Sequence, residues 1–289
     1  MAITYEIVKA VSADLYGSSL KKIPEDTKAA LRQARSSESD DNARATIDTM
    51  LRSADAAEQT MQFVCSDSGV PEYLVRIGTE AQLSGNIKQA FVDGFAYLVE
   101  MIEPPLLMHV QNPLTRERGY AGKDMPLVSY DLIDGADYIE IICSPKALGS
   151  GRWAAMEIFT SPPLDVIEKY ILECVLKAGS QACPPVVIGV GIGGSFDYCA
   201  KLAKQATLRE LGKRNPEPAV AAMEERLLKA VNKTGFGPMG TGGDSTAFAV
   251  HVEYAAGHGF TPVAVSFNCW INRKAGARIY NDGRIERFE

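Results

Sequence analysis

The chain has no excess of positive charge. Its 30 Lys and Arg residues are outnumbered by 36 Asp and Glu residues, which gives a formal net charge of -6. Binding to nucleic acid needs a basic face that neutralises phosphates, so this charge balance argues against a nucleic-acid partner. An anionic substrate would therefore have to be bound by local groups and not by the field of the whole protein.

Long apolar segments are lacking as well. Residues 1–17 contain no basic stretch followed by an apolar one, and the longest apolar runs, such as residues 184–190, are too short to cross a bilayer. We therefore expect no secretory signal, no membrane span and a cytoplasmic location. In such a reducing compartment the six cysteines would be packing residues, ligands or nucleophiles more often than disulfides.

Internal repeats and low-complexity tracts are also absent, and the composition, 46% hydrophobic and 23% charged, is typical of a globular protein. The first sixty residues are predicted to be helical, because apolar positions recur at three- and four-residue intervals through Ile23 to Ala34 and Ala43 to Met61. From residue 61 onward, short apolar and alternating segments alternate with helical ones. We therefore predict an α/β fold in one domain, residues 1–289, with a helical N-terminal segment (1–60) and a body of mixed sheets flanked by helices (61–289).

Several elements of that body can be placed on the sequence. Strands are predicted at residues 128–133 and 137–143, joined by a turn at Asp134-Gly135. Another strand at 183–194 ends in glycines, and two final strands cover 247–256 and 262–270. The predicted helices cover residues 79–101, 164–178, 195–211 and 218–233.

Cys65, Cys183 and Cys269 share a setting, since each lies in or beside a predicted strand end, next to Gly, Pro or polar turn residues. The other cysteines lie within apolar faces, where a thiol packs as a small hydrophobe; they are Cys143, Cys174 and Cys199. Three thiolates would leave one iron of a cubane cluster without a protein ligand, and that iron could act as a Lewis acid. The wide spacing by itself leaves core packing open for each thiol.

Gly189, Gly191 and Gly194 match the dinucleotide-binding pattern G-x-G-x-x-G, and Glu210 follows at a suitable distance. However, Glu210 falls inside a predicted helix, and no βαβ unit closes within about thirty residues. Two other interpretations remain. The glycines could permit close packing of a strand on a helix, or the amides at the start of the helix at Ser195 could bind an anion.

A second glycine-rich stretch, residues 235–243, is too rich in glycine to form regular structure. Its amides could form another anion-binding nest, or the stretch could be a flexible surface turn.

Four segments together resemble a known family. VCSDSGVP (64–71), NPLTRE (112–117), the stretch from Cys183 to Arg214, and the stretch from Gly235 to Ala275 are similar to the alpha subunit of two-subunit class I fumarate hydratases and L-tartrate dehydratases. The similarity extends, with gaps, from about residue 5 to about residue 280.

The resemblance implies an iron–sulfur hydro-lyase that reversibly hydrates a small carboxylic acid. Its [4Fe-4S] cluster would be held by Cys65, Cys183 and Cys269, and one iron would remain open. A separate beta subunit would supply the rest of the catalytic machinery. We therefore expect this chain to homodimerise within an assembly of two alpha and two beta subunits.

The resemblance also implies roles for four other residues. Asp67 would exchange a proton beside the open iron, unless it only forms an Asx-turn, and His258 would reach the site across a subunit interface, unless it is a solvated or capping side chain. Lys146 and Arg116 would each hold a substrate carboxylate, unless they are surface charges. His251 lies in a predicted strand and is expected to be structural.

Three departures from the family pattern fall on substrate-facing motifs. Ser66 replaces a glutamine, Leu107 and His109 stand where the family has arginine and asparagine, and Gly151-Arg152 replaces a Glu-Asn pair. We therefore predict an altered substrate, bulkier or less charged at one end than fumarate. Arg152 or His109 would supply a relocated cation, and Gly193 and Gly194 would offer backbone amides. The alternative is a non-catalytic or redox-sensing paralogue.

Overall fold

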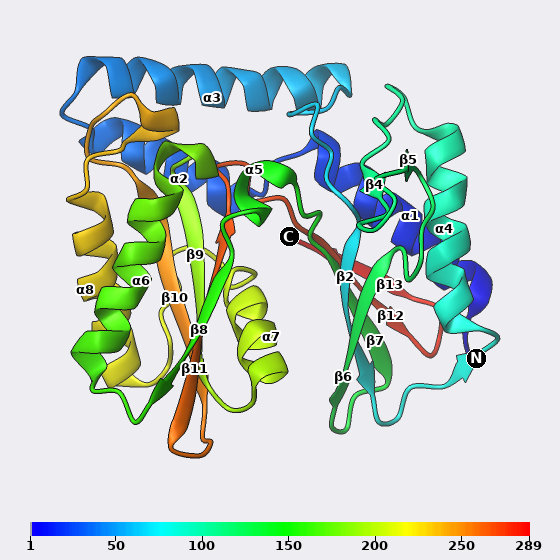
Figure 1. Ribbon diagram of the computed structural model, residues 1–289. Coiled ribbons are helices and arrows are strands. Elements are labelled where there is room, and N and C mark those ends of the chain that lie inside the picture. The colour runs from blue at the N-terminus through cyan, green and yellow to red at the C-terminus, as the bar shows by residue number, and fades with distance from the viewer. Residues whose placement is uncertain (1) are drawn as a thin grey trace. The chain divides into compact units, whose positions relative to one another are not determined.

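The computed structural model describes residues 2–289, which form two compact units (Figure 1). The first unit contains the described residues up to Pro24 together with Ala54–Ala147 and Arg273–Glu289. The second unit contains Glu25–Ser53 and Leu148–Asn272. The assignment of residues 1–289 to a single domain stays a prediction.

The N-terminal segment is helical, as predicted. After the short strand β1 (Ile3–Thr4), the helices are α1 (Tyr5–Lys21), α2 (Glu25–Ser37) and α3 (Asp41–Thr60). Thr4 caps α1 by accepting a hydrogen bond from the amide of Ile7. The helix α3 contributes its residues up to Ser53 to the second unit and the remainder to the first.

The first unit contains a mixed five-stranded sheet in the order β13-β12-β7-β2-β6. Its strands are β2 (Glu72–Gly78), β6 (Leu127–Ile133), β7 (Tyr138–Cys143), β12 (Ala275–Tyr280) and β13 (Ile285–Phe288). Only β2 and β6 pair in parallel. The sequence missed β12 and β13, and predicted 262–270 as the last strand.

The predicted pairing of residues 128–133 with 137–143 through the Asp134-Gly135 turn is wrong. Both strands exist as β6 and β7, but β2 lies between them and pairs with each. Three successive residues of β2 are buried, Tyr73 to Val75, which suits an interior strand. None of the residues of β6 is buried, which suits the sheet edge, so burial and not sequence proximity decides the partner.

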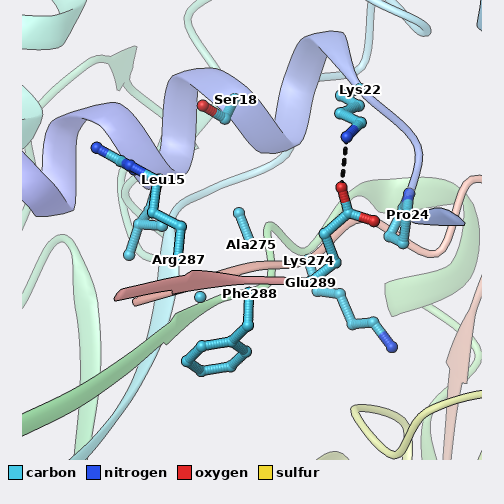
Figure 2. Close-up of a pocket in the computed structure, with 10 residues that line it drawn as sticks. Leu15, Ser18, Lys22, Pro24, Lys274, Ala275, Arg287, Phe288 and Glu289 are labelled. Carbon is cyan, nitrogen blue, oxygen red and sulfur yellow. Dashed lines mark hydrogen bonds and ion pairs between the residues drawn. The ribbon is translucent and has the colours of Figure 1, made fainter. Parts of the chain in front are cut away.

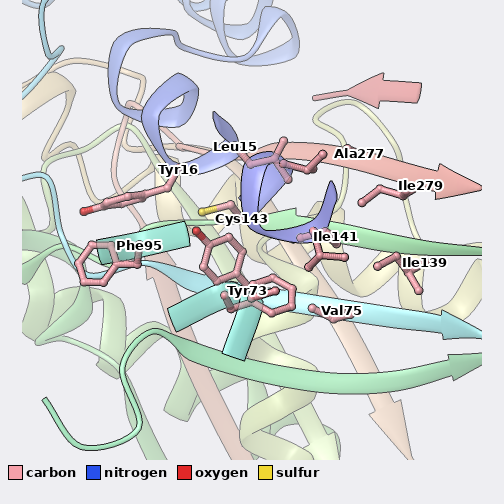
Figure 3. Packing of buried hydrophobic residues seen from close by; sticks show 14 of the residues in the cluster. Leu15, Tyr16, Tyr73, Val75, Phe95, Ile139, Ile141, Cys143, Ala277 and Ile279 are labelled. Carbon is pink, nitrogen blue, oxygen red and sulfur yellow. The ribbon is translucent and has the colours of Figure 1, made fainter. Parts of the chain in front are cut away.

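The core of the first unit lies between this sheet and two helices, α1 and α4 (Ile87–Met101) (Figure 3). Tyr16 of α1 packs edge-on against Phe95 of α4, and Tyr73 of β2 packs against Phe91. The helix α4 begins later than the predicted residue 79, because Asn86 caps it and the preceding residues form β3 (Leu83–Ser84) beside β1. Two further short strands are β4 (Val110–Gln111) and β5 (Arg118–Gly119).

The second unit contains a four-stranded sheet in the order β10-β9-β11-β8. Its strands are β8 (Ala155–Thr160), β9 (Val186–Gly193), β10 (Ala247–Ala255) and β11 (Phe260–Asn268). β10 runs parallel to β9, whereas β11 runs antiparallel to both β9 and β8. The edge strand β8 was not predicted from the sequence.

Helices cover both faces of this second sheet (Figure 1). α6 (Leu164–Ala178) and α8 (Pro218–Asn232) pack on one face, and α7 (Phe196–Ala206) packs on the other. The predicted helices at 164–178 and 218–233 are confirmed, whereas α7 ends five residues before the predicted Leu211. Short helical segments occur at α5 (Leu148–Gly151), η1 (Gly179–Ala182) and η2 (Pro238–Gly240).

Gly189 and Gly191 lie within β9 and not in a loop after it. A Cβ atom at Gly189 would lie 2.1 Å from the carbonyl oxygen of Ala203, and one at Gly191 would lie 2.1 Å from that of Cys199. The glycines therefore let the backbone of α7 approach the strand, and the close-packing interpretation is confirmed. A phosphate-binding loop at these positions is wrong, because their backbone belongs to the sheet.

None of the helices in residues 2–289 is long and apolar enough to span a bilayer.

Candidate functional site

The structure separates the six cysteines into two groups, and none of them forms a disulfide. Three are buried within the apolar cores, as predicted; they are Cys143, Cys174 and Cys199. Burial raises the pKa of each of these thiols, that of Cys199 to about 11. Cys65, Cys183 and Cys269 are only half-buried. The three cysteines outside the cores are thus the three predicted ligands.

In the first unit, Cys65 begins a loop, residues 65–69, that we call the cysteine loop. The hydroxyl of Tyr16 donates to the carbonyl oxygen of Gly69 at 2.9 Å. Arg273 donates through Nη1 to the carbonyl oxygen of Asp67 at 2.7 Å. Because Tyr16 and Arg273 are both buried, the loop is fixed from inside the unit.

Lys146 lies beside the end of this loop. Its amide and carbonyl exchange two hydrogen bonds with Val70, each of 3.0 Å. Gly69 has a φ of +70°, and a Cβ atom there would lie 2.7 Å from the carbonyl carbon of Lys146. Only glycine fits at this close approach, so the backbone itself places Lys146 next to the cysteine loop.

His109 also contacts the cysteine loop. Its Nε2 atom lies 3.7 Å from Oδ1 of Asp67 and 3.5 Å from the carbonyl oxygen of Ser66. Oδ1 of Asp67 also accepts a hydrogen bond from the amide of Gly69 at 3.2 Å, which is the Asx-turn considered for this residue. The first unit therefore brings Cys65, Ser66, Asp67, His109 and Lys146 together.

Arg116 occupies the exposed turn between β4 and β5. Its φ is +66°, and its amide donates to the carbonyl oxygen of Asn112 at 2.9 Å. The turn presents the guanidinium to solvent, so a role in holding a carboxylate stays a prediction.

In the second unit, Cys183 and Cys269 lie at the same end of the sheet. Cys183 precedes β9 and Cys269 follows β11, and the antiparallel register pairs Asn268 with Val187. The amide of Trp270 donates to the carbonyl oxygen of Cys183 at 3.0 Å. Cys183 adopts left-handed backbone angles, φ 57° and ψ 63°, a conformation that non-glycine residues rarely adopt and that often marks functional sites.

Two other segments surround Cys183. The short helix α5 brings Gly149 so close that a Cβ atom there would lie 3.3 Å from Sγ of Cys183. Arg152 follows directly after α5, is exposed and stacks over the ring of Trp153 at 4.7 Å. On another side, the amide of Met239 donates to the carbonyl oxygen of Pro184 at 2.8 Å, so the glycine-rich stretch 235–243 also adjoins this cysteine.

Gly193, Gly194 and His258 lie at the opposite end of the same sheet. The register pairs Gly193 with Ala255, and the amide of Gly194 donates to the carbonyl oxygen of Ala255 at 3.1 Å. His258 is exposed three residues later and stacks on Phe260. The length of β9 separates the two ends by about 23 Å, at about 3.3 Å per residue. One chain therefore does not bring these residues to Cys183 and Cys269.

Backbone amides in both glycine-rich regions already bind carboxylates of this chain. At the start of α7, Asp197 accepts from the hydroxyl of Ser195 at 2.7 Å and from its own amide and that of Tyr198, and these bonds lower its pKa. After the stretch 235–243, Oε1 of the buried Glu38 accepts from the amide of Asp244 at 2.8 Å. An external anion at either place would have to compete with an internal one.

His251 is structural, as expected. It is buried in β10, and its Nδ1 atom lies 3.0 Å from the carbonyl oxygen of Ala206. Burial and the nearby Arg209 lower its pKa to about 4, so the imidazole is neutral at physiological pH.

Sequence analysis did not identify Arg273 or Trp270 as parts of the site. Both follow Cys269 within a few residues, and Arg273 is buried although it is a cation. The sequence offered one signal for the site: two basic residues, Arg273 and Lys274, follow shortly after a predicted apolar strand. Cations that are buried normally need a specific partner, so a basic pair at such a place indicates a possible binding site.

The first unit also contains a cavity of about 300 Å³ (Figure 2). It is lined by α1, β12 and β13, and the Lys22–Glu289 ion pair of 2.5 Å closes one side. None of its lining residues was predicted as a site residue. In residues 2–289 as a whole, no three His, Cys, Asp or Glu side chains gather as ligands of one metal ion.

Comparison with known proteins gives the family. The family described as fumarate hydratase (Fumerase) matches residues 9–278. The chain belongs to the fumarate hydratase family. It is therefore a hydro-lyase, as the sequence motifs predicted.

Relatives within the fumarate hydratase family cover nearly the whole chain. A protein of Methanocaldococcus jannaschii, provisionally named as the alpha subunit of an L(+)-tartrate dehydratase, is 35% identical over 285 residues, which cover 96% of this chain and 99% of that protein. The L(+)-tartrate dehydratase subunit alpha of Escherichia coli K12 is 29% identical over 274 residues, which cover 92% of this chain and 89% of that protein. The relatives are thus single subunits of about the same length.

The two groups of cysteines predict different reactivity. In metal-free protein under anaerobic conditions, iodoacetamide at pH 8 should modify Cys65, Cys183 and Cys269 first. The three buried thiols should react at least about tenfold more slowly, because burial hinders access and raises their pKa. Peptide mass spectrometry over a time course measures each rate. Fast modification of Cys143 or Cys199 would contradict this assignment.

Proposed function

We propose that this chain is the cluster-binding alpha subunit of an iron–sulfur hydro-lyase that reversibly hydrates a small carboxylic acid. A [4Fe-4S] cluster would be held by Cys65, Cys183 and Cys269. The observation that carries the proposal is that these three thiols alone stand outside the apolar cores. The curated relatives are named as alpha subunits, which supports a separate beta subunit as partner.

The residues present fit a cubane cluster better than a single metal ion. In a cubane each thiolate binds a different iron, so the three sulfur atoms need not meet at one point. Gly149 leaves free the space that a side chain would fill beside Sγ of Cys183. When bound, a cluster with one iron free of protein ligands would supply a Lewis acid that polarises the substrate hydroxyl.

Asp67 and His109 are the groups of the cysteine loop that could move a proton. The Asx-turn fixes the carboxylate of Asp67, and the imidazole of His109 lies 3.7 Å from it. This separation is too long for a direct hydrogen bond, so a hydroxyl or water of the site could exchange a proton with either group. The base that removes the carbon-bound proton would come from the beta subunit, so this chain alone should be inactive.

Substrate carboxylates would be bound by cations near the three thiols. Lys146 adjoins the cysteine loop, Arg152 adjoins Cys183, and Arg116 could fold over the site from its exposed turn. Ser66, which replaces an amide side chain of the family pattern, offers a hydroxyl. The two residues before His109, Leu107 and Met108, have exposed apolar side chains. Such side chains suit a substrate that is bulkier or less charged at one end than fumarate.

His258, Gly193 and Gly194 would serve the cluster of a second copy of this chain. The sheet of the second unit separates them from Cys183 and Cys269 of the same chain. A symmetric dimer places the same surface of each copy against the other, so each site could receive His258 from its partner. This arrangement agrees with the expectation that the histidine acts across a subunit interface.

The cluster assignment predicts the metal content. The complex, reconstituted anaerobically, should contain about four irons and four sulfides per alpha chain, and Cys183→Ser should lose most of both. The matched control is Cys199→Ala, which removes a core thiol and should retain the cluster. Iron and sulfide analysis with an absorption spectrum measures the result. Wild-type protein without a cluster, or Cys183→Ser with a full one, would refute the assignment.

The altered motifs predict an altered substrate. The purified complex should turn over mesaconate, L(+)-tartrate or another substituted acid faster than fumarate. Leu107→Arg should improve kcat/KM for fumarate by about tenfold to hundredfold, because it restores a charge-assisted pair with a carboxylate. Steady-state assays over a panel of unsaturated and hydroxy acids test this. If the wild-type complex turns over fumarate as fast as an ordinary fumarase does, the prediction is wrong. If it turns over none of the acids, the non-catalytic alternative is favoured.

A shared site predicts complementation between two inactive variants. Cys183→Ser should lack the cluster, and His258→Ala should lose about hundredfold or more in kcat, since proton transfer contributes that much. A hybrid dimer with one chain of each variant has one site with both a cluster and a histidine. Isolated through two affinity tags, it should recover about half of the wild-type activity.

The control for complementation is the hybrid of Cys183→Ser with Cys269→Ser. Both of its chains lack a ligand, so no site can be complete and no activity should return. If the first hybrid is as inactive as its parents, His258 does not act on the partner's cluster.

A further inference from the structure

Arg273 is a buried cation of the first unit that contacts the cysteine loop. It follows Cys269 by four residues, and it begins the last segment of the first unit. Only 5% of its surface is exposed. Through Nη1 it donates to the carbonyl oxygen of Asp67, which is two residues from Cys65.

Within the described residues 2–289, this guanidinium forms no ion pair with a carboxylate. Its only hydrogen-bond acceptor there is the neutral carbonyl of Asp67, and its Nε atom is buried without a hydrogen-bond partner. The half-buried Arg209 behaves differently, since it forms ion pairs with both Glu224 and Glu253. Arg273 is therefore a buried charge without an ion-pair partner in the part of the chain that the structure describes.

A buried charge without a counterion is costly, and folded proteins normally pair it. Three thiolates bound to a [4Fe-4S] core form a centre with a net negative charge. We propose that Arg273 is the counter-cation of this centre, a positioning residue that holds the cysteine loop and balances the charge of the loaded cluster. The inference rests on the cluster assigned under Proposed function.

This role differs from that of a merely structural hydrogen bond. A structural arginine stabilises the protein with or without the cluster. A counter-cation stabilises chiefly the loaded protein, because in the empty protein its uncompensated charge opposes the benefit of its hydrogen bond to the cysteine loop. It also favours addition of an electron to the cluster, so it raises the cluster's midpoint potential.

The experiment compares Arg273→Met with Arg273→Lys in the full chain, purified anaerobically with its partner subunit. Methionine fills similar space without charge, whereas lysine retains the charge. For Arg273→Met we expect a more negative midpoint potential and loss of the cluster to a chelator about tenfold faster, the effect of one charge-assisted contact. The midpoint potential of Arg273→Lys should lie close to that of wild type.

Thermal unfolding of the cluster-free proteins supplies the second measurement. Empty Arg273→Met should be as stable as wild type or more stable, because the substitution removes an unbalanced charge. A variant that fails to fold, or that loses as much stability empty as loaded, would show a structural role and overturn the inference. Unchanged potential and unchanged cluster retention would overturn it too.

The two proposals fail differently. If wild-type protein binds no cluster, the proposed function falls, and this inference falls with it. If wild type loads a cluster that Arg273→Met does not affect, only the inference falls.

Discussion

The register of β9 between β10 and β11 is the constraint on which the chemistry of the second unit depends. Antiparallel pairing with β11 places the residues before β9 beside those after β11, so Cys183 and Cys269 share one end of the sheet. Parallel pairing with β10 places the end of β9 beside the end of β10, so Gly193 and the segment before His258 share the other. A single interior strand thus gives the unit two chemically different ends.

The interior of that unit is built so that the loops at these ends can carry function. Gly189 and Gly191 let α7 lie directly on β9, and the buried valines and isoleucines of the other face pack against α6 and α8. A rigid three-layer scaffold lets a residue such as Cys183 hold left-handed backbone angles, because hydrogen bonds from Trp270 to Cys183 and from Met239 to Pro184 fix its neighbourhood.

Local sequence context predicted the helices and the sorting of the cysteines, because burial follows from the apolar pattern around each residue. It failed where distant segments decide the outcome. The partner of β6 is β2 and not the adjacent β7, and the separation of His258 from Cys183 depends on strand register. The burial of Arg273 was equally hidden, since a basic residue in the sequence does not reveal what surrounds it.

The positions of the charged side chains near the cysteine loop bear on which substrate the proposed site would bind. The family pattern has a permanently charged guanidinium where this chain has the apolar side chain of Leu107. The imidazole of His109 lies 3.7 Å from the carboxylate of Asp67, so any positive charge on it would face a negative one. Arg273 is buried behind the loop and bound to its backbone. In the proposed function, the loss of one fixed cation at this loop supports a substrate that is bulkier or less charged at one end than fumarate.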